Sequence, residues 1–231
     1  RVHELVDGLV WPGHSMGRPV AGTAKTLPRI SRSDLHAHHR GFYHADGTIL
    51  SMAGAVDPRA FVDFAAEKLG SMKNGKCPRF TAPPPPIEGP VFTAEERSLR
   101  QTHLVFAWRV PGFRDADRAA RQLLCVMLGG NSSSRLFQEV RERRGLCYSI
   151  SADLALFHDT GMSSVSVSLD LKNARLAARA LFRQLRDLST RVPARAELDR
   201  AREYLAGSSG IALERTSAQE NRIGYSMMAH G

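Results

Sequence analysis

Four consecutive prolines lie in the segment TAPPPPIEGP, residues 81–90. Proline lacks an amide hydrogen and holds φ at about −65°, so such a run cannot lie inside a helix or a central strand. Proline-rich segments favour an extended, semi-rigid backbone instead. The sequence therefore predicts a linker over residues 81–90, with one folded part before it and another after it.

The bulk composition is that of a folded protein. The chain has 231 residues, of which 42% are hydrophobic and 24% charged, enough for one large domain or two small ones. No apolar run approaches the roughly 18–20 residues that cross a bilayer, so we expect no membrane partner. The chain starts RVHELVDGLVWPGH, without an initiator Met or a signal sequence. We therefore expect either that the N-terminus was removed or that the chain is part of a longer polypeptide.

The net charge is +9, and arginine supplies most of the excess. A basic protein can have an acidic partner such as nucleic acid. However, the sequence has no zinc-finger spacing, no RNA-binding sheet signature and no basic tail. We favour arginine-rich, solvated helix faces and expect no specific nucleic-acid partner.

The three cysteines include no C-x-x-C pair. This argues against a disulfide scaffold and suits a reducing compartment, which favours a cytoplasmic location.

Before the linker the pattern predicts helix, loop, helix, strand, helix. A short helix covers residues 2–9, and a second helix follows the N-cap candidate Ser31. Residues 48–56, TILSMAGAV, indicate a buried strand. The next helix has Asp57 as its cap and an apolar face. The residues of this face are Phe61, Phe64, Ala65 and Leu69.

After the linker the pattern predicts a strand in QTHLVFAWRV and a helix closed by Gly129 and Gly130. A short helix follows that ends with Arg141, Arg143 and Arg144 and is broken at Gly145, and we call it the arginine-rich helix. CYSISADLALF and MSSVSVSLDL alternate at period two and indicate a hairpin joined by HDTG. Two further helices complete the chain, and the first of them directs Leu176, Ala180 and Leu181 inward.

The two parts share one order of elements. In each of them a strand leads through a polar cap into a helix of similar length, at residues 48–72 and 163–189. We interpret this as two copies of one α+β module cut out of register, so that the first lacks its beginning and the second its end.

A histidine cluster is the first candidate site. His36 and His39 lie one turn apart on a predicted helix, with His38 and His44 nearby, and could share a metal ion. No cysteine or suitably spaced carboxylate completes the site, so ordinary surface histidines are favoured. His3 is followed by Glu4, but H-E-x-x-H and H-x-x-E-H are both absent. We expect no metal to be bound by this chain.

Arg141 and Tyr148 form the second candidate site. Gly145 lets the chain turn between them, so a helix end and a strand start can project both side chains from one corner. A guanidinium and a phenol both donate hydrogen bonds to a peptide carbonyl or a developing oxyanion. The alternative, favoured by spacing alone, is a helix-end arginine and a packed tyrosine ring.

Three separated motifs resemble the pitrilysin family of inverted-motif zinc peptidases, which includes insulin-degrading enzyme and the mitochondrial processing peptidase. LGGNSSSRLFQEVRERRGLCYSISA is similar to the motif of the family's second module. WPGHSMGRPVAGT resembles a first-module segment, PGHPLGRPVLGT, and FYHADGTILSMAGAVD resembles the strand and turn after it. The resemblance covers essentially the whole chain, in the right order.

The resemblance implies an α+β fold of two homologous modules, each an antiparallel sheet with helices packed on one face. Residues 1–80 would be the C-terminal part of the first module, 81–90 the linker, and 91–231 the second module, truncated at its end. Both modules are then incomplete. The zinc-binding H-x-x-E-H helix would precede this chain, so zinc belongs to the parent protein only.

The resemblance also implies a function. Arg141 and Tyr148 match the family's substrate-clamping pair, which holds the substrate backbone and stabilises the tetrahedral intermediate while zinc-bound water attacks. Arg135, Gln101 and His14 also match, and we interpret them as structural. The parent would be a zinc metalloendopeptidase that cleaves peptides or unfolded polypeptides in an enclosed chamber. This part alone would be inactive.

Two alternatives stay open. The family also includes non-catalytic partner subunits, and a homo- or heterodimer with a second family subunit is expected in either case. A basic nucleic-acid-binding protein is the weaker alternative.

Overall fold

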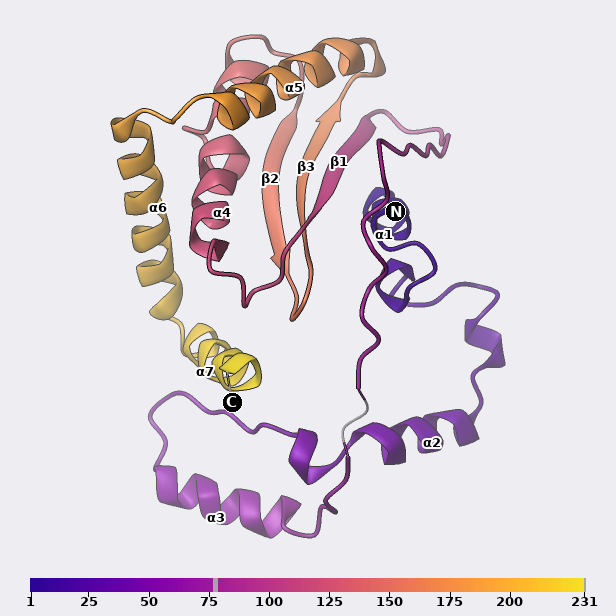
Figure 1. Ribbon diagram of the computed structural model, residues 1–231. Helices are drawn as coiled ribbons and strands as arrows, with labels where there is room; N and C mark the ends of the chain where they lie inside the picture. The colour runs from indigo at the N-terminus through magenta and orange to yellow at the C-terminus, as the bar shows by residue number, and fades with distance from the viewer. Residues whose placement is uncertain (77–78, 231) are drawn as a thin grey trace. The chain divides into compact units, whose positions relative to one another are not determined.

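The computed structural model describes residues 1–76 and 79–230 (Figure 1). Its contacts divide the chain into two compact units. The first unit comprises Arg1–Val20 and Ala82–Ala206, and the second comprises Ala21–Thr81 and Gly207–Gly231. The fold class is α+β, as predicted from the sequence. The division into a first module, a linker and a second module remains a prediction.

The first unit is built on a three-stranded antiparallel sheet. Its strands are β1 (Thr102–Val110), β2 (Ser149–Leu156) and β3 (Gly161–Leu169), in the order β1-β3-β2. The central strand β3 pairs with β1 from Thr102↔Leu169 to Val110↔Gly161, and with β2 from Ser149↔Ser168 to Leu156↔Gly161. The predicted hairpin and the predicted strand before it are thus confirmed.

Helices surround this sheet (Figure 1). α1 contacts β1, and the helical turns after α4 contact β2. The helices of this unit are α1 (Val2–Val10), α4 (Arg118–Cys125), α5 (Ala174–Thr190) and α6 (Arg195–Leu213, up to residue 206), with π-helical turns at Val126–Gly130 and Phe137–Glu142.

The core lies between the sheet and these helices. Leu136 and Val140 of the arginine-rich helix, Val165 and Leu169 of β3, and Leu181 of α5 are almost completely buried. The same buried cluster also includes Ile150 and Ala152 of β2, so the arginine-rich helix packs against both β2 and β3 and against α5.

One predicted core residue of α5 is wrong. Ala180 and Leu181 are buried, but Leu176 is 51% exposed. The buried face of α5 is centred on Ala177, Ala180 and Leu181, and Leu176 precedes Ala177 by one helical step of about 100°. It therefore lies at the edge of the outer face.

Gly129 has a different role from the helix-closing one predicted for it. The helical turns do end at Gly130, but neither glycine has a positive φ. A Cβ on Gly129 would lie 2.7 Å from the backbone nitrogen of Ala152 in β2. Gly129 is needed because the helix packs its backbone directly against the sheet.

The second unit is helical in its described residues. Its helices are η2 (Leu27–Arg29), α2 (Arg32–Phe42), η3 (Ala45–Gly47), α3 (Pro58–Leu69) and α7 (Thr216–His230). Ser31 and Asp34 form a reciprocal capping box at the start of α2, and Asp57 caps α3 by accepting from the Arg59 amide. Both predicted N-caps are confirmed.

The strand predicted at residues 48–56 is wrong, because this segment is irregular. No strand of the described part of the second unit lies beside it to exchange backbone hydrogen bonds, and an unpaired strand is not stable. Ser51 instead donates a hydrogen bond to Glu220 of α7. Phe64 and Leu69 of α3 are exposed, so the predicted apolar face of that helix is not buried within the unit.

Leu181→Ala and Leu176→Ala test the core assignment on a single helix. Leu181 is 1% exposed, so its truncation should lower the free energy of unfolding by about 2–5 kcal/mol. Leu176→Ala should change it by about 0.5 kcal/mol or less. Urea unfolding measures both values. Equal losses would contradict the assigned faces.

Candidate functional site

The arginine-rich helix ends in a sharp corner that carries both predicted site residues. Arg141 lies in the π-helical turn Phe137–Glu142, and the amide of Gly145 donates to the Arg141 carbonyl at 3.0 Å. Gly145 has a φ of +60°, a left-handed conformation that glycine adopts without strain. The Leu146 amide then donates to the carbonyl of the buried Val140 at 3.0 Å, which closes the corner.

Arg141 presents an exposed guanidinium at this corner. The group lies over the ring of Phe137, with 4.6 Å between the guanidinium carbon and the ring centroid. Its charge acts to lower the pKa of the Cys147 thiol, although burial raises that pKa by more. Within residues 1–76 and 79–230, no carboxylate pairs with Arg141. Its donors therefore remain available for a ligand.

Tyr148 is held by its backbone while its side chain stays accessible. Its amide donates to the Ser168 carbonyl of β3 at 2.8 Å, and its side chain is 52% exposed. The phenol hydroxyl donates to the Asp170 carboxylate at 3.1 Å. This hydrogen bond and the charge of Asp170 raise the phenol's pKa. Tyr148 therefore stays protonated at neutral pH and can donate a hydrogen bond.

Arg141 and Tyr148 occupy the two sides of one corner, and each contacts a different neighbour. The Arg141 guanidinium stacks on the Phe137 ring, and the Tyr148 hydroxyl donates to Asp170. Among the described residues, no hydrogen bond joins Arg141 to Tyr148. Cys147, next to Tyr148, lies within the electrostatic range of Arg141. The shared role of the two residues in substrate binding stays a prediction.

The sequence interpretation missed Asp170 and Asn173. Asp170 accepts from Tyr148, and the Asn173 side chain donates to the Leu146 carbonyl at 3.2 Å. The hairpin gave a usable signal for Asp170. The pairing of Ser149 with Ser168, continued outward from the hairpin, places Asp170 opposite Cys147, the residue next to Tyr148.

Arg135 is structural, as interpreted from the sequence. Its guanidinium donates to Asp187 of α5 at 2.7 Å and to both oxygens of Glu197 of α6 at 2.6 and 2.7 Å. These bonds raise the pKa of Arg135, which is largely buried. Gln101 accepts a hydrogen bond from Ser168, and His14 accepts one from the Met16 amide. All three residues therefore make contacts within the fold.

The other two arginines at the helix end, Arg143 and Arg144, both lie near the Glu139 carboxylate. Arg144 contacts the Glu139 carboxylate at 2.6 Å, whereas Arg143 lies 3.6 Å from it. The Arg143 side chain is the more exposed of the two.

The histidine cluster does not form a metal site. His38 and His39 stack on the rings of Phe42 and Tyr43, and a ring nitrogen of His44 contacts the Gly41 carbonyl. No group of three His, Cys, Asp or Glu side chains within residues 1–76 and 79–230 could hold a metal ion. The donors in this part of the chain therefore do not fit a zinc ion. Cys77 lies outside the described residues.

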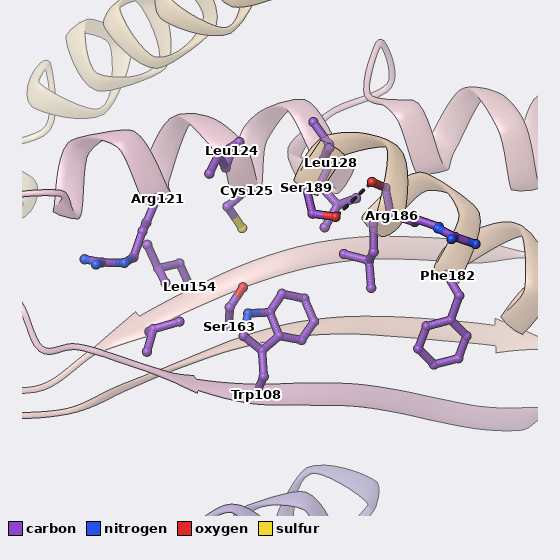
Figure 2. A pocket seen from close by; sticks show the side chains of 13 residues that line it. Trp108, Arg121, Leu124, Cys125, Leu128, Leu154, Ser163, Phe182, Arg186 and Ser189 are labelled. Atoms are coloured by element: carbon purple, nitrogen blue, oxygen red, sulfur yellow. Dashed lines mark hydrogen bonds between the residues drawn. The ribbon is translucent and has the colours of Figure 1, made fainter. Parts of the chain in front are cut away.

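A second feature of the first unit is an apolar cavity of about 560 Å³ between the sheet, α4 and α5. Figure 2 shows Trp108 of β1, Cys125 of α4 and Phe182 of α5 around it. Burial and the charge of Asp153 raise the pKa of the Cys125 thiol to about 11, so this group is not a nucleophile at neutral pH. Arg121 at the cavity is paired with Asp115 at 2.6 Å. Cys125 and Arg121 are therefore both unsuited to a catalytic role in this cavity.

The chain matches a known family model over most of its length. Residues 29–205 match the model described as the peptidase M16 inactive domain. The match spans more than half of the chain. The chain therefore belongs to the peptidase M16 family.

Relatives of this family have similar sequences. An uncharacterized zinc protease of Mycobacterium tuberculosis (strain ATCC 25618 / H37Rv) is 35% identical over 229 residues, covering 94% of this chain and 50% of the relative. An uncharacterized zinc protease of Bacillus subtilis (strain 168) is 27% identical, covering 100% of this chain and 56% of the relative. The chain thus spans about half the length of the curated relatives it matches.

Solved structures share the fold. The crystal structure of a peptidase M16 inactive domain from Pseudomonas fluorescens superposes with a TM-score of 0.83 at 23% identity, covering 97% of this chain and 54% of that chain. A protease from Helicobacter pylori gives a TM-score of 0.84 at 16% identity, covering 98% of this chain and 56% of that chain. At these identities the likeness concerns the fold alone.

In the described part of the chain, no helix combines the length and the apolar character that a bilayer crossing requires.

Asp170→Asn tests the electrostatic environment of Tyr148. Removing the carboxylate charge should lower the pKa of the Tyr148 phenol toward the ordinary tyrosine value, because the phenolate then meets no negative neighbour. An ultraviolet titration of tyrosinate measures the shift, and Tyr148→Phe identifies the component that Tyr148 contributes. An unchanged titration in Asp170→Asn would contradict the Tyr148–Asp170 contact.

Proposed function

We propose that this chain is the substrate-binding part of an M16-family zinc endopeptidase that cleaves peptides or unfolded polypeptides. In this proposal Arg141 and Tyr148 donate hydrogen bonds to the substrate backbone and to the oxyanion that develops on the attacked carbonyl. The observation that carries it is the corner itself. There an exposed guanidinium, which has no carboxylate partner among the described residues, and a protonated, half-exposed phenol flank one turn.

The two donors suit different parts of that task. The guanidinium offers several N–H donors and a permanent charge, which favour an oxyanion over the neutral carbonyl from which it forms. The phenol donates one hydrogen bond from a backbone pinned to β3, so it loses little freedom when a substrate binds. Asp170 keeps this phenol in its donating form.

In this proposal the zinc ion is bound outside this chain. The relatives are named zinc proteases, whereas the described residues here provide no three-ligand group. We propose that the parent polypeptide supplies the zinc ion and the attacking nucleophile from outside this chain. The chain by itself is then inactive, and its partner is a polypeptide substrate.

A non-catalytic partner subunit is the second candidate, supported by the matched model being that of an inactive domain. Such a subunit would dimerise with a catalytic family member and could lend it Arg141 and Tyr148. The sequence upstream of Arg1 distinguishes the two. An intact H-x-x-E-H motif favours the enzyme, and a disrupted motif favours the partner subunit.

The experiment for the enzyme uses the full-length polypeptide that carries this chain. Tyr148→Phe or Arg141→Ala should each lower kcat/KM for an unfolded polypeptide by about 10²–10³, because each removes a donor to the oxyanion. Zinc content by metal analysis should stay unchanged. Peptide cleavage is followed by mass spectrometry.

Two control variants remove the same kinds of side chain, an arginine and a tyrosine hydroxyl, from outside the proposed site. Arg143→Ala removes an arginine two residues from Arg141, and Tyr225→Phe removes an exposed phenol elsewhere. Both variants should retain wild-type cleavage. Activity within a few-fold of wild type in Tyr148→Phe and Arg141→Ala would reject the assigned roles.

A further inference from the structure

Helix α5 carries four arginines on one face. They lie at i, i+4, i+8 and i+11 and form what we call the arginine face, which consists of Arg175, Arg179, Arg183 and Arg186. All four are exposed. At a rise of about 1.5 Å per residue, the face runs for about 16 Å along the helix.

The arginine face lies opposite the core. Ala177, Ala180 and Leu181 point into the unit, and each arginine lies on the far side of the helix from them. Arg175, Arg179 and Arg183 therefore take no part in the packing of α5 against the sheet, whereas Arg186 also lines the edge of the apolar cavity.

None of the four guanidinium groups pairs with a carboxylate among the described residues. Other arginines of the same unit do find carboxylates, as Arg135 does with Asp187 and Glu197, and Arg144 does with Glu139. Asp187, the acidic residue of α5, is already occupied by Arg135 and Arg191. The positive charge of the arginine face is thus uncompensated within the unit.

Like charges at i and i+4 destabilise a helix, so an uncompensated line of arginines is unfavourable unless an anion binds it. Two exposed apolar side chains flank the line. Leu176 lies on one side and Phe182 on the other, and the Phe182 ring meets that of Phe106 edge-on at 5.4 Å. Figure 2 shows Phe182 and Arg186 one turn apart on α5.

The arginine face starts next to the candidate site. Asp170, which accepts from Tyr148, precedes Arg175 by five residues, and Asn173 bonds the Leu146 carbonyl in the corner. α5 therefore leads away from the corner that carries Arg141 and Tyr148. A polypeptide held at that corner has a basic helix face within reach along the chain.

We propose that the arginine face binds an acidic segment of the polypeptide substrate. This inference rests on the proposed function, because it names a substrate class for the same protein. Carboxylates suit the site because they take two parallel hydrogen bonds from a guanidinium. Glutamates spaced at i and i+4 on a helical segment match the spacing of the arginines along α5.

A polypeptide fits better than a nucleic acid. The face is a single convex helix, and the apolar groups beside it are one leucine and one phenylalanine that packs against β1. Single-stranded nucleic acid is bound in grooves with aromatic platforms for its bases. The arginine face offers no such platform among the described residues.

The test measures binding to the full-length polypeptide with its zinc chelated, so that the probe is bound and not cut. The probe is a fluorescent alanine-rich peptide with glutamates at i, i+4 and i+8, and fluorescence anisotropy gives Kd. The double variant R179Q/R183Q should bind at least about tenfold more weakly than wild type, and added salt should weaken binding to wild type more than to the variant. The same peptide with glutamines should bind no variant appreciably.

The control variant removes the same charge elsewhere. R40Q/R59Q alters two exposed arginines of α2 and α3 that have no ion pair in the described part of the chain, and it should bind within about threefold of wild type. Circular dichroism confirms that both double variants are folded. Equal losses in both variants would assign binding to net charge and overturn the proposal.

Two further outcomes would also overturn it. A single-stranded oligonucleotide of matched charge that binds through Arg179 and Arg183 more tightly than the peptide would assign the face to nucleic acid. Binding of the glutamine peptide as tightly as the glutamate peptide would remove the role of charge. Tyr148→Phe should lower cleavage but leave peptide binding to the arginine face intact. The binding test of the arginine face can therefore fail without contradicting the proposed catalytic roles, and the reverse also holds.

Discussion

Pairing of β3 with strands on both sides is the constraint on which the first unit depends. β3 is the central strand, and its register with β1 and β2 sets the position of nearly every feature of the unit. At one end of β3, Ser168 bonds on both sides, because its carbonyl accepts from the Tyr148 amide and its hydroxyl donates to Gln101. A slip of one residue would reverse the faces of β2 and separate Tyr148 from Asp170. The candidate site is thus a consequence of strand register.

A second constraint comes from charge inside the fold. Arg135 joins the arginine-rich helix to α5 and α6 through two carboxylates at 2.6–2.7 Å. Removing one partner from such a partly buried cluster would leave a charge with little water around it, so the cluster specifies how these three segments meet. It also explains why Arg135 is unavailable for a ligand, although it lies only six residues before Arg141.

Local sequence patterns predicted what depends on local chemistry. The capping box of α2, the Asp57 cap of α3 and the alternating hairpin strands all follow from short-range rules. The strand at 48–56 failed because a strand needs a neighbour, and no period in TILSMAGAV says whether one is present. Leu176 failed because one helical step separates it from the buried face. Arg141 and Tyr148 stood out only through the family resemblance, since spacing alone favoured ordinary structural roles.

The arginines of this chain divide into two groups by what surrounds them. Arg135, Arg121 and Arg144 have carboxylate partners within the first unit, so their charges are used in holding segments together. Arg141 and the arginine face of α5 have none among the described residues. Asp170 and Asn173, which precede α5 in the chain, bond Tyr148 and Leu146 of the corner and so link the corner to this helix. A net charge of +9 therefore says less about partners than the distribution of unpaired guanidinium groups does. In this unit that distribution favours a ligand that offers a backbone carbonyl at the corner and carboxylates along α5, and a polypeptide offers both.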